Sequence, residues 1–271
     1  MRLSYMTNAF APLVGTVAGV TTITENGYLT LADEDVLLAE VAAGGYTHFD
    51  IFEGNIARYA EAPEEFKALM AKHGVSLLGV YIGGNFIYPD ALPDELAKVD
   101  RITALAKSFG ASHIILGGGS LRAGGIREED HALLGAGLDK AAEIVEGHGL
   151  VATYHPHLGS LAETPEQIHK LFAASKVGFC PDIAHLAAGG GDALELVKQY
   201  RDRVQYVHLK DLSESGEFMP LGKGILPIAE IVTYLKESGY EGDWCVEVDG
   251  YSGDPAEACK VSYDFLKGLL V

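Results

Sequence analysis

Short apolar runs alternate with longer amphipathic runs along the whole chain. The short runs are rich in β-branched and aromatic residues and are bounded by turn residues, a pattern typical of β-strands. They lie at residues 2–6, 47–52, 76–82, 112–117, 150–155, 177–181, 204–209 and 243–248. Several of these runs are apolar on both faces, as the strands of a parallel sheet covered by helices must be.

Between the predicted strands, apolar residues recur at the spacing of an amphipathic helix. The predicted helices lie at residues 33–45, 63–74, 96–110, 134–149, 164–175, 191–200, 226–239 and 253–270. The run at 164–175 opens with Thr164, Pro165 and Gln167, which predicts a capping box with proline in the first helical turn.

Strict alternation of eight strands with helices predicts a (β/α)8 TIM barrel formed by residues 1–271 as a single domain, rather than an open doubly wound sheet. The glycine-rich run at 117–125 follows the fourth strand and lacks the spacing of a dinucleotide-binding loop. Its first glycines, Gly117 to Gly119, are expected to form a flexible turn. Because TIM barrels place their active sites at the C-terminal ends of the strands, candidate residues are sought there.

The charge balance excludes one class of function. The chain has 20 Lys and Arg against 38 Asp and Glu, a formal net charge of −18. Without a basic stripe it is not expected to bind nucleic acid, which depends on Lys and Arg contacts to phosphates. An acidic protein is suited to recruiting a divalent cation.

The same sequence gives no sign of a membrane or secreted protein. No apolar run reaches the length of a bilayer span, and no signal-type stretch follows Met1. Cys180, Cys245 and Cys259 lack metal-binding spacing and have apolar neighbours, so we expect buried free thiols in a reducing compartment. The expected location is the cytoplasm, and assembly into a homo-oligomer stays open.

The predicted strand ends are rich in residues that bind metals or sugars. They are Asp50 and Glu53 (second strand), Asn85 (third), His155 and His157 (fifth), Asp182 and His185 (sixth), His208, Lys210 and Asp211 (seventh), and Glu247 and Asp249 (eighth). Each residue alone could be structural. Carboxylates and imidazoles on four adjacent strands together predict a site for one divalent cation.

These residues lie in motifs that resemble the xylose-isomerase-like sugar isomerase/epimerase superfamily of TIM barrels, and within it the inosose dehydratase type. The motifs are YHPHLGS at 154–160, ETPEQIHKL at 163–171, the run from DIAH to HLKD at 182–211, LGKG at 221–224 and GYEGDWCVEVD at 239–249. The first half resembles the superfamily only in topology, and residues 4–31 suggest a different first loop. The resemblance implies that His155, Asp182, His208 and Glu247 hold one divalent metal.

Two positions depart from the superfamily pattern. Its epimerases carry a Glu-x-His arrangement on the fifth strand, where this chain has His155 and His157. The symmetric pair of carboxylates that epimerisation uses is therefore missing, which favours a lyase. Lys223 stands where the superfamily often has an acid.

The resemblance implies a lyase that acts on a ketosugar or keto-cyclitol, in the manner of an inosose dehydratase. A base removes the α-proton, the metal stabilises the enediolate, and the β-hydroxyl leaves as water. His157 or His185 is the expected base, and Lys210 or a protonated histidine the expected acid. Glu247 is expected to act both as ligand and as catalytic carboxylate.

Other roles follow from position. Glu53, Asn85 and His185 are expected to bind substrate hydroxyls, and Asp50 to support the site from behind its ligands. Lys210 has a structural alternative, an ion pair with Asp211 or Glu247. Mn²⁺ or Co²⁺ is the expected metal, with Zn²⁺, Fe²⁺ or Mg²⁺ as alternatives for this ligand set.

Three other functions remain open. A sugar isomerase or epimerase that acts on a ketose would share the first proton transfer. A β-eliminase of 3-keto-glycosides would expel a sugar or aglycone instead of water. A non-catalytic sugar-binding module would need no metal ligands. An endonuclease that acts on abasic DNA shares the barrel, but the net charge disfavours it. In each favoured case the partner is a small sugar or cyclitol.

Overall fold

The computed structural model describes residues 1–14 and 22–270. Its central feature is an eight-stranded parallel sheet with the order β8-β7-β6-β5-β4-β1-β12-β9. The strands are β1 (Leu3–Met6), β4 (His48–Phe52), β5 (Ser76–Gly84), β6 (His113–Gly118), β7 (Val151–Tyr154), β8 (Gly178–Phe179), β9 (Tyr206–Leu209) and β12 (Asp243–Val246). Parallel bridges from Phe179 to Val204 and from Asp182 to His208 connect the two edges. The predicted barrel is confirmed.

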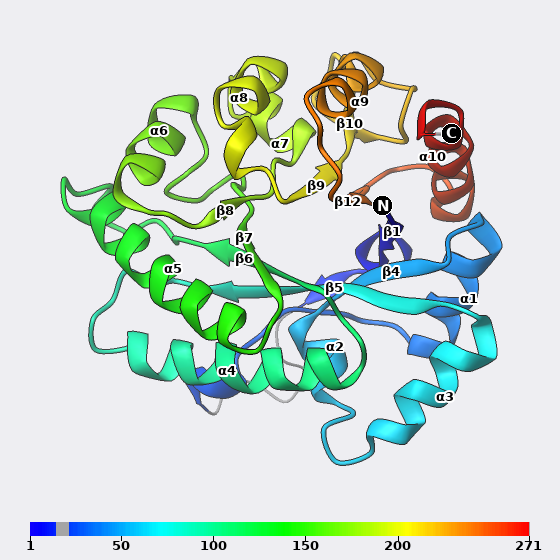
Figure 1. Ribbon diagram of the computed structural model, residues 1–271, viewed down its shortest axis with the longest axis horizontal. Coiled ribbons are helices and arrows are strands. Elements are labelled where there is room, and N and C mark those ends of the chain that lie inside the picture. Colours follow the sequence, from blue (N-terminus) through cyan, green and yellow to red (C-terminus); the bar gives the residue numbers. More distant parts are fainter. Residues whose placement is uncertain (15–21, 271) are drawn as a thin grey trace.

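A helix follows each strand and packs on the outside of the barrel (Figure 1). These helices are α1 (Glu34–Gly44), α3 (Pro63–His73), α4 (Leu92–Ser108), α5 (Asp130–Gly147), α6 (Pro165–Ala174), α8 (Ala193–Gln199), α9 (Ile228–Glu237) and α10 (Pro255–Leu270). The capping box of α6 forms as predicted, because Thr164 and Gln167 accept hydrogen bonds from each other's backbone N–H groups. Such a cap satisfies N–H groups that have no partner within the helix.

Short elements in the loops were not predicted. They are η1 (Thr7–Phe10), β2 (Leu13–Val14), η2 (Ile23–Glu25), β3 (Leu29–Thr30), α2 (Glu53–Ala57), α7 (Ile183–Ala188), η3 (Arg201–Arg203), β10 (Asp211–Leu212) and β11 (Phe218–Met219). Strands β2 and β3 pair antiparallel within the first loop. Residues 15–21 of the predicted unusual first loop lie outside the described residues.

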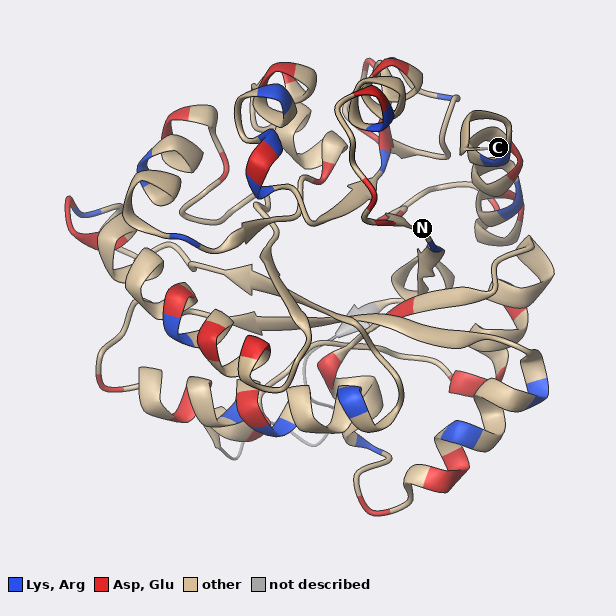
Figure 2. Ribbon diagram, viewed as in Figure 1, with Lys and Arg blue, Asp and Glu red and all other residues tan. Residues whose placement is uncertain are grey.

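The barrel has an inner and an outer core. Met6, Phe52, Leu78, Ile115, Cys180, Tyr206 and Cys245 form one buried cluster, with Tyr81 packed against it. A larger apolar cluster includes the inward faces of the helices. The three cysteines are buried and free, as predicted. Charged residues lie mainly on the outer helices and loops (Figure 2).

No helix in the described part of the chain combines the length and apolarity that crossing a membrane requires.

One local prediction was wrong. Gly117 and Gly118 belong to β6 and pair with Gly83 and Gly84 of β5, so the start of this glycine run is strand and not a flexible turn. A Cβ at Gly117 would overlap the hydroxyl of Tyr81. Glycine is needed here because another side chain approaches the backbone closely.

Candidate active site

Four residues at the ends of adjacent strands meet in a buried cluster. His155 follows β7, Asp182 follows β8, His208 lies in β9 and Glu247 follows β12. Each offers a ligand-type atom, and these atoms all lie within 4.8 Å of one another. The backbone N–H of His155 donates to Leu116, and that of Glu247 to Leu209, so the barrel's hydrogen bonding continues into the site and fixes these positions.

Several buried polar atoms of this cluster lack a hydrogen-bond partner within the described chain. They are both ring nitrogens of His155 and Nε2 of His208. Oδ2 of Asp182 makes an ion pair with Lys210. Unpartnered buried polar atoms are costly and therefore rare in folded proteins. Burial, with His208 nearby, holds the pKa of His155 well below its usual value, so its ring is neutral and keeps a free lone pair. Imidazole nitrogens and carboxylate oxygens are ligands that fit a divalent cation.

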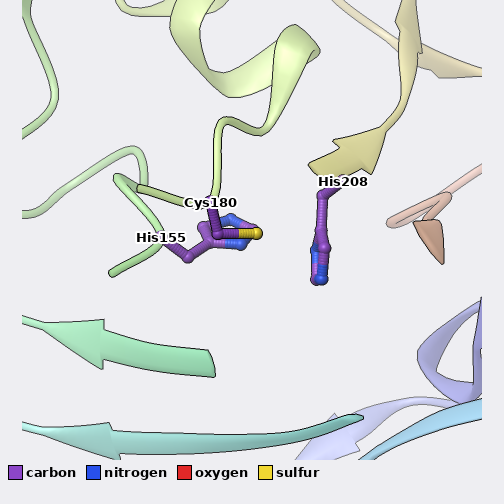
Figure 3. Close-up of side chains that lie close together, drawn as sticks. All are labelled: His155, Cys180 and His208. Atoms are coloured by element: carbon purple, nitrogen blue, oxygen red, sulfur yellow. The ribbon is translucent and has the colours of Figure 1, made fainter. Parts of the chain in front are cut away.

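A thiol lies beside two of these ligand-type residues. The Sγ atom of Cys180 is within 4.8 Å of ring nitrogens of His155 and His208 (Figure 3). Burial raises the pKa of Cys180, which favours the protonated thiol. The sequence predicted a buried thiol here but gave no sign of its neighbours, because Cys180 has no metal-type spacing to another residue.

Lys210 is fully buried among carboxylates. Its Nζ atom lies 3.1 Å from Oδ2 of Asp182 and 3.3 Å from Oε2 of Glu247, and it also donates to Asp249. Burial disfavours the charged form of Lys210, but the three carboxylates outweigh this effect and raise the pKa of Lys210. Lys210 therefore stays an ammonium group.

The alternative ion pair between Lys210 and Asp211 is wrong. The Asp211 carboxylate accepts hydrogen bonds from the backbone of Gly222, Gly224 and Leu226 and orders the following loop. The pair with Glu247 is present. Lys223, in the same loop, is exposed.

The formal charges at the cluster do not cancel. Three carboxylates, those of Asp182, Glu247 and Asp249, surround the single ammonium group of Lys210. Burial opposes a charge on His208, but Cys180 and Glu247 outweigh burial and raise the pKa of His208, so this ring can carry a second positive charge. An excess of negative charge remains even then. Uncompensated buried charge is strongly unfavourable, and a bound cation would relieve it.

Hydrogen bonding gives His157 and His185 different proton arrangements. Nδ1 of His157 lies 2.8 Å from the carbonyl oxygen of Leu158, which can only accept, so Nδ1 carries the proton and the lone pair is on Nε2. Nε2 of His185 lies between two partners, 3.1 Å from Lys210 Nζ, which can only donate, and 3.4 Å from Oδ2 of Asp249, which can only accept. Burial and the neighbouring His185 lower the pKa of His157, which keeps its ring neutral.

The cluster opens onto a cavity of about 750 Å³ at the C-terminal ends of the strands. Glu247, Asp249, His155, His157 and His185 supply polar groups to its lining. Aromatic side chains line the same cavity: Phe10, Tyr28, Phe52, Tyr81, Phe218 and Tyr251.

The structure brings together most of the predicted site residues, but it places Glu53 and Asn85 elsewhere. Glu53 is buried beside Lys98, and its Oε1 accepts from the backbone of Gly83. Asn85 donates to Glu95. Neither Glu53 nor Asn85 lines the cavity within the described residues. Asp50 lies deeper in the barrel, with Oδ2 3.9 Å from His208 Nε2, and accepts from Tyr206.

Sequence reasoning missed Asn8 and the aromatic residues of the cavity. The Asn8 amide donates to Oε1 of Glu247 at 3.0 Å and also to Asp249. Its position just after β1 was a usable signal, because the first strand must end at the same mouth as the others. Tyr28 and Phe218 had no such signal, since they lie in loops.

Comparisons with known proteins agree with this architecture. The family model described as "Xylose isomerase-like TIM barrel" matches residues 38–269. An inosose dehydratase from Geobacillus kaustophilus is 28% identical over 264 residues, covering 85% of this chain and 83% of that protein. An inosose dehydratase from Clostridium perfringens is 31% identical over 159 residues, and the chain spans about half of its length, 52%.

Solved structures share the fold at low sequence identity. The probable 3-DHS dehydratase AsbF from Bacillus anthracis has a TM-score of 0.75 and 13% identity, covering 98% of this chain and 99% of that one. A xylose isomerase-like TIM barrel protein from Mycobacterium smegmatis, in complex with magnesium, has a TM-score of 0.74 and 17% identity, with 99% and 96% covered.

Proposed function

The chain belongs to the xylose isomerase-like TIM barrel family, and on this premise we propose that it is a divalent-metal-dependent lyase that dehydrates a ketosugar or keto-cyclitol. The observation that carries the proposal is the excess of carboxylates over cationic groups beside ring nitrogens of His155 and His208 that lack a hydrogen-bond partner among the described residues. The relatives named inosose dehydratase support the same type of reaction. His155, Asp182, His208 and Glu247 would hold the metal.

A divalent cation bound there would serve as a Lewis acid toward the keto oxygen of the substrate. The protein supplies the proton transfers. His157 is the base, because Nε2 has a free lone pair and the ring lines the cavity. After taking the α-proton, the imidazolium returns it to the departing hydroxyl, so water leaves and an enone remains. A positioned base of this kind contributes about 10²–10⁴-fold to the rate.

His185 and Lys210 have supporting roles in this scheme. Lys210 holds Asp182, Glu247 and Asp249 in place, and its raised pKa makes it a poor proton donor. Nε2 of His185 already contacts Lys210 and Asp249, whereas its Nδ1 has no partner among the described residues. We assign Nδ1 of His185 to a substrate hydroxyl.

The substrate is proposed to be unphosphorylated. No Lys or Arg lines the cavity within the described residues, and residues 15–21 contain neither. Lys210 is already paired with carboxylates. Phosphate groups are normally held by Arg, Lys or helix N-termini, and the acidic lining here would repel a phosphate. Mn²⁺ or Co²⁺ remains the preferred metal of the proposal, with Zn²⁺, Fe²⁺ and Mg²⁺ as alternatives.

The test combines metal analysis with product analysis. The purified protein is stripped with chelator, reloaded with Mn²⁺ or Co²⁺, and incubated with inososes and unphosphorylated ketohexoses. We expect an ultraviolet-absorbing enone whose formation requires the metal. Formation of an isomeric sugar without enone would establish the isomerase or epimerase alternative. Full turnover in protein verified to be metal-free would refute the proposal.

The assignment of the base is tested with a matched pair of variants. His157→Gln should retain the metal and slow the exchange of a deuterium label from the α-carbon by about 10²–10⁴-fold. His185→Gln should weaken substrate binding more than exchange. If His185→Gln loses the exchange of the deuterium label while His157→Gln keeps it, the base is His185, and the assignment of His157 is refuted.

A further inference from the structure

The cavity is larger than a single sugar ring needs. Its volume of about 750 Å³ lies in the upper part of the range of roughly 300–1,000 Å³ found for sites of drug-sized ligands. The polar groups that would act on a sugar are those of His157, His185, Glu247 and Asp249. A single sugar ring would leave part of the aromatic lining without a ligand contact.

Three aromatic rings beside the metal-type cluster pack against one another, and we call them the aromatic cluster (Tyr28, Phe52 and Tyr81). Tyr81 packs edge-on against His155 with 5.9 Å between ring centroids. Phe52 lies 5.3 Å from Tyr81, and Tyr28 lies 6.3 Å from Phe52 and 6.4 Å from Tyr81. These spacings are those of interacting aromatic pairs. Tyr28 is the exposed member of the aromatic cluster, with 45% of its surface accessible.

Tyr28 is held in this position by the loop that carries it. Its carbonyl oxygen accepts from the N–H of Gly54 at 2.9 Å. Its ring packs on Gly83, where a Cβ would overlap it. Lys98 donates to the carbonyl of Asn26 at 2.9 Å and to that of Gly83, which ties the loop to the end of β5.

Aromatic side chains that line a cavity with a few convergent polar groups are typical of small-molecule sites. Fixing the ring in advance reduces the ordering cost that a ligand must overcome. The arrangement is thus suited to a flat, apolar group that extends from the sugar toward solvent.

We infer that the aromatic cluster is a subsite for an aryl substituent, so that the substrate is a keto sugar that carries an aromatic aglycone. The inference rests on the proposed function for the position of the sugar. The aglycone stacks on Tyr28 while the sugar ring reaches His157 and Glu247. Neutral aromatic groups also suit a cavity without Lys or Arg in its described lining.

Binding without turnover tests this subsite. Phenyl β-D-glucoside and methyl β-D-glucoside share the sugar and differ in the aglycone. With Mn²⁺-loaded wild-type protein, isothermal titration calorimetry should show roughly tenfold tighter binding of the phenyl glycoside, the size of an aromatic stacking contribution. Tyr28→Ala should abolish most of this preference and Tyr28→Phe should retain it. Leu31→Ala, on the same loop and outside the cavity lining, controls for loop disruption.

The outcomes separate the subsite from the chemistry. Equal binding of the two glycosides by wild-type protein, or an unchanged preference in Tyr28→Ala, would overturn the subsite. Loss of the preference in Leu31→Ala to the same extent would also overturn it. A phenyl preference that depends on Tyr28, in a protein that forms no enone from any keto sugar, would support the subsite while the proposed function fails.

Discussion

The free energy of unfolding of the wild-type protein is expected to fall as the pH rises. Glu53→Gln should show a smaller fall. Glu53 is 1% exposed, and its Oε2 has no hydrogen-bond partner among the described residues. Burial raises its pKa from 4.5 to about 7, although Lys98 and the N–H of Gly83 act in the opposite direction. The folded protein therefore prefers the protonated acid.

The sign and size follow from this pKa. An acid whose pKa is raised by folding stabilises the protein fully below its unfolded value, near pH 4.5, and the contribution is lost as the pH rises through about 7. At 1.36 kcal/mol per pKa unit, the rise corresponds to about 3 kcal/mol. Glutamine keeps an oxygen for the Gly83 N–H but cannot ionise.

The assay is urea unfolding at pH 5.5 and pH 8.5. Between these values the wild type should lose about 2 kcal/mol more free energy of unfolding than Glu53→Gln does, because part of the effect lies below pH 5.5. Lys98→Met is the matched control. The Lys98 ammonium group lowers the pKa of Glu53, so its removal should raise this pKa and move the loss of stability to higher pH.

Two results would refute the reasoning. Identical pH dependence in wild type and Glu53→Gln would mean that Glu53 is not a buried, strained acid. An increase in KM in Glu53→Gln, without any change in the pH dependence of unfolding, would instead support the sequence-based assignment of Glu53 as a substrate contact.

Three further predictions test the site and its support. Lys210→Met should lower the free energy of unfolding by about 3–5 kcal/mol in metal-free protein, because it leaves three carboxylates without their ammonium partner; unchanged urea denaturation would contradict this. Asp182→Asn should reduce the metal content measured by inductively coupled plasma mass spectrometry, and wild-type stoichiometry would argue against its role as a ligand. Gly117→Ala should lower stability by about 1–3 kcal/mol, seen as a lower Tm, because its Cβ meets the Tyr81 hydroxyl.

The sequence predicted the barrel well because each strand and helix leaves a strong periodic signal. All eight predicted strands correspond to strands of the barrel, although β8 keeps only Gly178–Phe179 of the predicted 177–181. Pro181 explains the shortening, since proline cannot donate to the sheet. The small loop elements, such as β2 with β3, are too short for periodicity to reveal.

Position along the strands predicted which residues lie near one another in the site, but not where each side chain points. The rule that strand ends meet at one mouth brought His155, Asp182, His208 and Glu247 together correctly as neighbours. The same rule misjudged Glu53 and Asn85, because a residue just after a strand can turn under the loop instead of into the cavity. Side-chain direction and loop contacts decide this, and neither is encoded in spacing.

The histidine at position 155 links the charge of the cluster to the direction of the reaction. A glutamate there, as in the epimerases that the sequence resembles, would add a further carboxylate to a cluster that already holds more carboxylates than cationic groups. It would also provide a second carboxylate for proton return. In the proposed mechanism, Nε2 of His157 takes the α-proton from one side, and no matching carboxylate at position 155 returns it from the other. Loss of the β-hydroxyl then competes well with epimerisation, which is why the lyase is the preferred proposal.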